Sequence, residues 1–230
     1  MPVVLIPTGL LEWHGDHLPL GVDALKAYGI CERISNKING GIVMPPNYFG
    51  RPGFSSYVGT LTFSEACMDL LFTELFAELK KVGAKVIVLV TGHYGPCQVD
   101  FVKRVSKYFM KANSDMVIIA QPEYEGITIN QESPQDHAGK WETSMMMTIR
   151  PDLVRMERFD PEKTSKKKIY DAPANRFYGE KEAWEWDGDL RKTASGELGQ
   201  KVIEETSSRI AELVRKILIE KWLFTKNEVG

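Results

Sequence analysis

The stretch Lys85–Thr91, KVIVLVT, decides the fold class of this 230-residue chain. All residues from Val86 to Val90 are apolar, so the strand that they predict is buried on both faces. Such strands belong to parallel sheets that helices cover on each side. Gly92 and His93 follow directly, which places a histidine at the carboxyl end of the strand, where open α/β sheets bind ligands.

The segments on either side alternate between strand and helix patterns. Short apolar runs predict strands at 3–6, 42–44 and 116–120, and apolar residues at helical spacing predict helices at 23–38, 99–111, 141–149 and 195–222. A further long helix is expected to be capped by Ser64 and ended by Gly83. This alternation predicts an α/β fold with a mostly parallel central sheet.

The length predicts a single domain over residues 1–230. Within it, residues 155–190 are mostly polar and show no clear periodicity, so they are expected to form a loop-rich excursion. The lysine run 166–168 in this segment is expected to lie in a solvated turn.

Composition excludes several classes of protein. With 29 Lys and Arg against 31 Asp and Glu, the formal net charge of −2 argues against a nucleic-acid or anionic-membrane binder. The three cysteines are far apart and include no CxxC pair, which excludes a disulfide scaffold or a cysteine-rich zinc module and suits a reducing compartment. No apolar run approaches the roughly 20 residues of a membrane span. A cytoplasmic location is therefore expected.

Each of the four histidines lies within two residues of a glycine: His14, His17, His93 and His137. Glycine lets the backbone turn sharply and approach a ligand closely. A histidine without a function would not need such neighbours, so this pattern favours a shared site.

The first histidine cluster contains Glu12, His14 and Asp23. In an extended segment, Glu12 and His14 point the same way, and Asp23 at the start of a helix can return to the same centre. Carboxylate and imidazole ligands suit Zn²⁺, Mn²⁺ or Fe²⁺. Taken singly, Asp23 would be a helix cap and Glu12 a solvated carboxylate. Together with His14 they favour a metal site.

The other clusters add possible ligands and an acid/base pair. His93 lies where a parallel sheet presents its ligand, although it would also suit the end of a strand. The adjacent Asp136 and His137 suggest general acid/base chemistry. Glu142 can face the same centre from the start of a helix, where interaction with the helix dipole is the alternative explanation.

Three segments, in this order, resemble the creatininase (creatinine amidohydrolase) family: EWHGDHLPLGVD at Glu12–Asp23, TGHYG at Thr91–Gly95 and HAGKWETS at His137–Ser144. The combination is specific and spans most of the chain. The resemblance implies a three-layer α/β sandwich, a binuclear metal site and, commonly, a hexamer.

The resemblance also implies roles for single residues. It assigns the metal ligands Glu12, His14, Asp23 and His93, with Asp23 as the bridge. Creatininase supplies another glutamate where this chain has Gly95, so Glu142 becomes the candidate fifth ligand. His137 matches the family's acid/base histidine, and Asp136 is expected to orient it.

These assignments predict metal-assisted hydrolysis of a small molecule. Two divalent ions, Zn, Mn or Fe, would activate a water for attack on a carbonyl. His137 would protonate the leaving group. Tyr94 and Trp184 are expected to contact the substrate. Trp184 and Trp186 would form part of a lid or, alternatively, pack as partly buried aromatics. A homo-oligomer, possibly a hexamer, is expected.

The bond that is cleaved is left open. Hydrolysis of the C–N bond of a small cyclic amide or formamide is favoured, and carbon–carbon hydrolysis of a cyclic diketone from inositol breakdown is the alternative. A non-catalytic metal-binding sensor is a second alternative, for which changing His137 to Ala would leave function intact. The pair of Asp136 and His137 argues against it, because simple binding needs no acid/base pair.

Overall fold

The computed structural model describes residues 3–162, 165–171 and 176–223. Its central sheet has the order β2–β1–β3–β4, and every neighbouring pair is parallel. The strands are β1 (Val3–Thr8), β2 (Ile42–Val43), β3 (Val86–Thr91) and β4 (Val117–Pro122). The parallel sheet expected from the sequence is confirmed, with the KVIVLVT segment in its interior.

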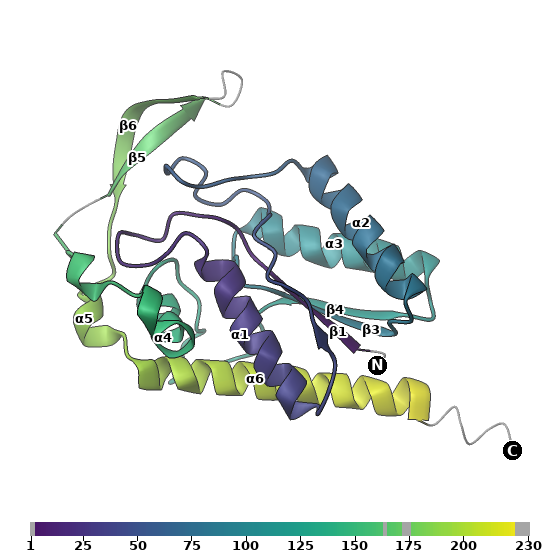
Figure 1. The fold of residues 1–230 in the computed structure, drawn as a ribbon. Coiled ribbons are helices and arrows are strands. Elements are labelled where there is room, and N and C mark those ends of the chain that lie inside the picture. Colours follow the sequence, from purple (N-terminus) through teal and green to yellow (C-terminus); the bar gives the residue numbers. More distant parts are fainter. Residues whose placement is uncertain (1–2, 163–164, 172–175, 224–230) are drawn as a thin grey trace, which may run out of the picture.

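Helices cover both faces of this sheet (Figure 1). On one face lie α1 (Val22–Lys37), α4 (Lys140–Ile149) and α6 (Gly196–Leu218), and on the other lie α2 (Glu65–Lys81) and α3 (Pro96–Ala112). Alternate residues of β3 point to opposite faces: Val88 packs with the first layer, and Ile87 and Leu89 pack with the second. The three-layer α/β sandwich is therefore confirmed.

The helix ends follow local capping chemistry. The Ser64 side chain accepts the N–H of Cys67 and caps α2, and Gly83 follows its C-terminus with a φ of +96°. Helix α3 begins at Pro96, three residues before the expected start, because proline at the first helical position needs no N–H partner. The last helix ends at Leu218 and continues as a π-helical turn over Ile219–Leu223.

The loop-rich excursion expected at 155–190 is wrong in part. It contains an antiparallel hairpin of β5 (Ser165–Asp171) and β6 (Arg176–Trp184), so the lysine run 166–168 lies in a strand and not in a turn. The hairpin projects from the body of the molecule (Figure 1). The pairing of the two strands has register shifts between Lys166 and Lys167 and between Lys168 and Ile169, so no regular alternation marks the hairpin in the sequence.

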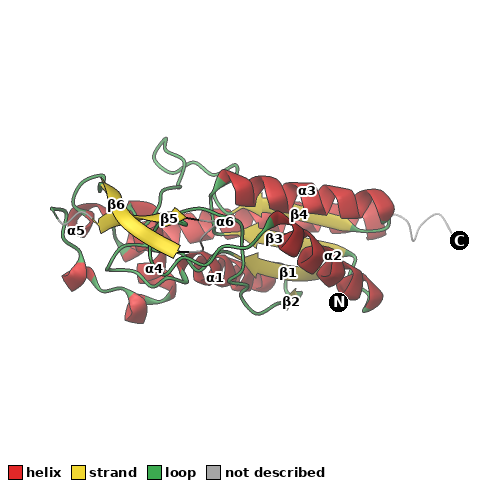
Figure 2. Ribbon diagram, turned by 90° about the horizontal axis from the view of Figure 1, so that it is seen from above, coloured by secondary structure: helices red, strands yellow, loops and turns green. Residues whose placement is uncertain are grey.

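Short elements flank the hairpin: η1 (Pro151–Leu153), η2 (Met156–Arg158) and α5 (Leu190–Thr193). Figure 2 shows α4 and α5 at the same end of the molecule as the hairpin. In the described part of the chain, no helix has the length and apolar character needed to cross a membrane.

Candidate active site

The five ligands expected from the sequence converge beyond the carboxyl ends of β1 and β3. All five are buried: Glu12, His14, Asp23, His93 and Glu142. Glu12 and His14 come from the loop after β1, Asp23 from the first turn of α1, His93 from the loop after β3 and Glu142 from the first turn of α4. The loops at this edge of the sheet therefore bring together residues that lie more than 100 positions apart in the sequence.

Asp23 lies between two groups of side chains. Its Oδ1 is 3.1 Å from His14 Nε2, which lies 3.3 Å from Glu142 Oε2. Its Oδ2 is 3.3 Å from His93 Nδ1, which lies 3.1 Å from Glu12 Oε2. Within each group the ligand atoms lie within 4.8 Å of one another. Each group thus offers one imidazole and two carboxylates, a donor set that suits a divalent transition metal, and Asp23 belongs to both.

Three atoms that face the two groups are buried without a hydrogen-bond partner: Glu12 Oε2, His14 Nε2 and Asp23 Oδ2. A buried polar atom without a partner is costly, and a metal ion would satisfy these donors by coordination. The residues present therefore fit metal ions.

The electrostatics of the cluster agree with this fit. Burial alone would lower the pKa of His14, but Asp23 and Glu142 raise that pKa well above 6.5. Burial likewise opposes protonation of His93, yet Glu12 and Asp23 raise its pKa to about 10. The carboxylates thus stabilise positive charge between them. Protons on the histidines supply this charge in the metal-free protein, and divalent ions would supply it in the metal-bound protein.

Close backbone approach shapes the site. The Phe54 N–H donates to Glu12 Oε1. A Cβ at Gly53 would overlap Glu12 Oε1 and the His93 ring, so this loop reaches the cluster only as glycine. The His14 Nδ1 lies 2.9 Å from the Glu12 carbonyl oxygen, which leaves His14 Nε2 facing Asp23. Sequence reasoning missed the Gly53–Phe54 loop, although its glycine was a usable signal.

Two buried charges were also missed, Lys26 and Glu123. Lys26 Nζ lies 2.6 Å from Glu142 Oε1 and 2.8 Å from Glu123 Oε1. Burial opposes ionisation of Glu142, but Lys26 and His14 lower its pKa to about 2. A signal was present: Lys26 follows Asp23 by three residues, on the same helix face, and Glu123 follows the end of β4.

His137 lies beside the cluster, at its solvent side. Its Nε2 is 2.7 Å from the Trp13 carbonyl oxygen, and its ring stacks on Phe54 with centroids 3.8 Å apart. The Nδ1 atom lies 3.8 Å from Glu12 Oε2. Burial, followed by the proximity of His14, lowers the pKa of His137 to about 4. The imidazole is therefore neutral at pH 7.

Asp136 binds the first turn of α4. Its carboxylate accepts the N–H groups of Trp141 at 2.8 Å and of Glu142 at 3.2 Å, and so caps α4. Burial and the nearby Glu142 raise the pKa of Asp136 to about 6. The orienting contacts described for His137 come from Trp13 and Phe54, whereas Asp136 anchors the helix that carries Glu142.

His17 is buried apart from both ion groups. Its Nε2 lies 3.0 Å from the Thr143 hydroxyl, and its ring packs edge-on against Phe159 and Trp186. Trp186 is thus a packing aromatic in this structure. The side chain of Trp184 lies outside the described residues.

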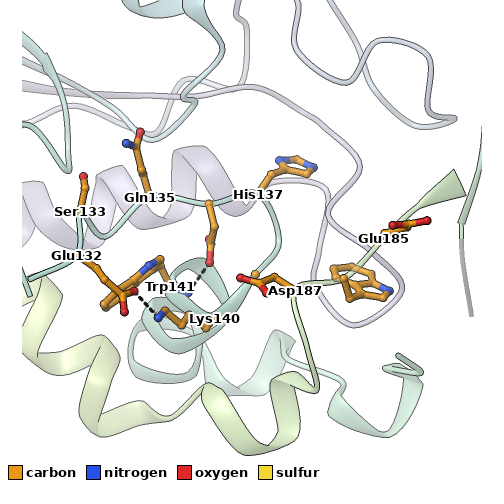
Figure 3. Close-up of a pocket in the computed structure, with 11 residues that line it drawn as sticks. Glu132, Ser133, Gln135, His137, Lys140, Trp141, Glu185 and Asp187 are labelled. Atoms are coloured by element: carbon orange, nitrogen blue, oxygen red, sulfur yellow. Dashed lines mark hydrogen bonds and ion pairs between the residues drawn. The ribbon is translucent and has the colours of Figure 1, made fainter. Parts of the chain in front are cut away.

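Two cavities adjoin the cluster. One of about 230 Å³ is lined by Tyr94, His137 and four of the five expected ligands, and one of about 450 Å³ shares Asp136 and His137 with it. The Tyr94 hydroxyl donates to Glu123 and accepts from Lys26. Figure 3 shows the larger cavity, with Trp141, the paired side chains of Glu132 and Lys140, and Asp187 around it.

The model of a known family, Creatininase (creatinine amidohydrolase), matches residues 1–214. The chain belongs to the creatininase family. It is 28% identical to a creatinine amidohydrolase of Pseudomonas putida, over 93% of this chain and 89% of that protein. It is also 28% identical to a mycofactocin precursor peptide peptidase of Mycolicibacterium smegmatis, over 67% of this chain and 60% of that protein.

Solved structures of creatininases share the fold. A tryptophan-to-phenylalanine variant of creatininase matches with a TM-score of 0.72 and 25% identity, over 93% of this chain and 90% of that one. A Zn–Zn form of a glutamate-to-glutamine variant matches with a TM-score of 0.71 and 23% identity, over 93% and 90%. A manganese creatininase matches with a TM-score of 0.67 and 24% identity, over 93% and 90%. This creatininase-family chain is thus an enzyme, a metal-dependent hydrolase.

Proposed function

We propose that this enzyme hydrolyses the C–N bond of a small cyclic amide or formamide with two divalent ions per chain. The observation that carries the proposal is the position of Asp23, whose two carboxylate oxygens face two separate groups of ligands. Glu12, Asp23 and His93 would hold one ion, and His14, Asp23 and Glu142 would hold the other. Zn²⁺ and Mn²⁺ are the first ions to test, because creatininases with each are known.

Ions at such a site supply an activated water and polarise the substrate carbonyl. The protein supplies the proton transfer. The Nε2 of His137 faces a carbonyl oxygen, so Nε2 carries the hydrogen and Nδ1, which lies 3.8 Å from Glu12 Oε2, is the basic nitrogen. His137 is neutral at pH 7 and can therefore accept a proton at Nδ1 and return it to the leaving nitrogen.

The cavities support a small substrate cleaved beside His137. The cavity of about 230 Å³ at the ligand cluster has room for a small ring or a formyl group. The cavity of about 450 Å³ shares Asp136 and His137 with it and would take the rest of the substrate. A cleavable amide placed between the two would have its leaving nitrogen beside the imidazole.

The named relatives favour a C–N bond. One is an amidohydrolase and the other a peptide peptidase, and both names describe cleavage of amides. Hydrolysis of a cyclic diketone would use the same water and the same polarised carbonyl. No contact in the described part of the chain favours it, so it enters as an outcome of the assay.

The test combines metal analysis with a substrate panel. Elemental analysis of protein purified without added metal is expected to show close to two transition-metal ions per chain. The loaded enzyme is then assayed with creatinine, small formamides, short peptides and a cyclic diketone. Turnover of an amide supports the proposal, whereas turnover of only the diketone, or metal-free protein with full activity, would contradict it. The homo-oligomer stays a prediction that light scattering on the same sample would test.

A further inference from the structure

Lys26 is a buried cation next to one of the two ion groups. Its side chain has no exposed surface, and no other lysine or arginine is buried in the part of the chain that the structure describes. Besides Glu142 and Glu123, its Nζ contacts the Tyr94 hydroxyl at 2.8 Å and the Gly92 carbonyl oxygen at 3.3 Å. These four oxygens come from two loops and a helix, so the ammonium group is held in one place.

The two ion groups are otherwise closely matched. Each has one imidazole and two carboxylates, and Asp23 is common to both. In each group the unshared carboxylate accepts one backbone N–H: Glu12 from Phe54, and Glu142 from Ala138 at 2.6 Å. The two groups therefore have the same kinds and numbers of donors.

Lys26 breaks this match. In Glu12, Oε1 accepts the neutral Phe54 N–H and Oε2 faces His93 at 3.1 Å. In Glu142, by contrast, Oε1 is bound by the charged ammonium group of Lys26 at 2.6 Å, and Oε2, which faces His14, also accepts the Ala138 N–H. The ammonium charge also withdraws negative charge from the ligand and repels a divalent ion at that position.

We propose that Lys26 is a positioning residue that makes the two ions unequal: it binds Glu142 Oε1, places a full positive charge beside this ligand and so weakens ion binding by His14, Asp23 and Glu142. This inference rests on the proposed function, because it requires two ions. One effect acts in the opposite direction, since the Glu12 carbonyl orients the His14 ring. That contact holds a neutral ring, whereas Lys26 places a full charge against a ligand and so dominates.

Glu123 sets the strength of this effect. It is buried, and its Oε1 lies 2.8 Å from Lys26 while its Oε2 has no hydrogen-bond partner. Its negative charge offsets part of the charge of Lys26. Removing Glu123 alone should leave Glu142 facing a less compensated ammonium group, whereas removing both should leave Glu142 free.

The experiment titrates the Zn²⁺-loaded enzyme with a chromogenic chelator at one pH. In the wild-type enzyme we expect two steps whose dissociation constants differ by about tenfold or more. Crystals of half-stripped enzyme should show anomalous scattering beside His93 and not beside His14. The Glu123→Gln variant should widen the gap, that is, increase the ratio of the two dissociation constants. The double variant Lys26→Met with Glu123→Gln should decrease this ratio. The matched control is Lys103→Met with Glu125→Gln, which removes an exposed ion pair and should leave the gap unchanged.

The two variants are expected to change the ratio of dissociation constants in opposite directions, which a general disturbance of the fold would not do. If both variants shift the gap in the same direction, or if the remaining ion lies beside His14, the proposal is wrong. Wild-type enzyme that binds two ions equally also overturns it, whereas wild-type enzyme without ions overturns the proposed function instead. Should the double variant not fold, as thermal unfolding would show, the direction of the Glu123→Gln shift still decides.

Discussion

The two faces of the central sheet differ in what they bury. The layer of α2 and α3 packs apolar side chains against β1, β3 and β4, with Phe72, Phe76 and Phe101 meeting edge to face. The layer of α1, α4 and α6 is equally well packed in its middle. At the carboxyl ends of the strands, however, it also buries Asp23, Lys26 and Glu142.

The difference indicates that the α2–α3 layer mainly stabilises the fold, whereas the other layer also carries the candidate active site. Buried charges cost free energy unless they are paired, and removing one partner is strongly destabilising. The aromatic layer contributes apolar burial without any such cost. Substitutions in the α2–α3 layer should therefore change stability and spare the chemistry, whereas substitutions at the ligand cluster should change metal binding and turnover.

The largest effect is expected from Asp23→Asn. This change removes the charge that faces both ion groups, so bound metal should fall from about two ions to fewer than one and turnover should fall to background. Elemental analysis and the amide assay measure both. Asp100→Asn, at an exposed position on α3, is the control. Two tightly bound ions in Asp23→Asn would show that Asp23 is not the bridge.

The next effect is expected from His137→Ala. Loss of a general acid/base group typically lowers turnover by about 10²–10⁴-fold, and the ions should remain because His14 and His93 are unchanged. Turnover and metal content are measured on the same sample. Loss of an ion would instead make His137 a ligand, as its place near Glu12 and His14 allows. Unchanged turnover would remove it from the mechanism.

In the opposite layer, Phe72→Ala tests the scaffold. The ring is 1% exposed, and a buried phenylalanine replaced by alanine costs about 3–5 kcal/mol of the free energy of unfolding. Urea unfolding measures this loss, and kcat of the folded fraction should stay unchanged. Leu70→Ala, on the same helix but 62% exposed, should cost less than about 0.5 kcal/mol. A large fall in kcat would contradict the division between the layers.

The smallest effect concerns His17, a buried imidazole outside the ion groups. Burial, followed by the proximity of His14, lowers its pKa to about 4. Below pH 6.5 the unfolded chain therefore binds a proton at His17 more readily than the folded chain. The free energy of unfolding should fall by about 2 kcal/mol as the pH falls toward 4. Metal-free His17→Gln should lose less stability than metal-free wild type between pH 7 and pH 4.5, as urea unfolding would show. Equal losses of the free energy of unfolding in the two proteins would mean that His17 takes up no proton when the chain unfolds.

The convergence of the candidate ligands could be anticipated because their signals are local. The segment from Glu12 to Asp23 carries its glycines and ligands within a few residues of one another, and His93 follows the most apolar strand directly. Helix and strand positions are equally local, since periodicity and caps act over one or two turns. Asp136 shows the limit: adjacency to His137 suggested a pair, but the first turn of α4 offers its carboxylate two backbone N–H groups.

The sequence by itself determined the alternation of helices and strands, the family and the residues gathered at the site. Only the tertiary structure decided how those residues divide into two groups around Asp23, and that Lys26 enters one of them. The reason is that such contacts join distant segments: Lys26 and Glu142 are 116 residues apart, and only the packing of α1 against α4 brings them together. No periodicity or motif encodes a pairing of this kind, because each partner alone has an ordinary place on its own helix.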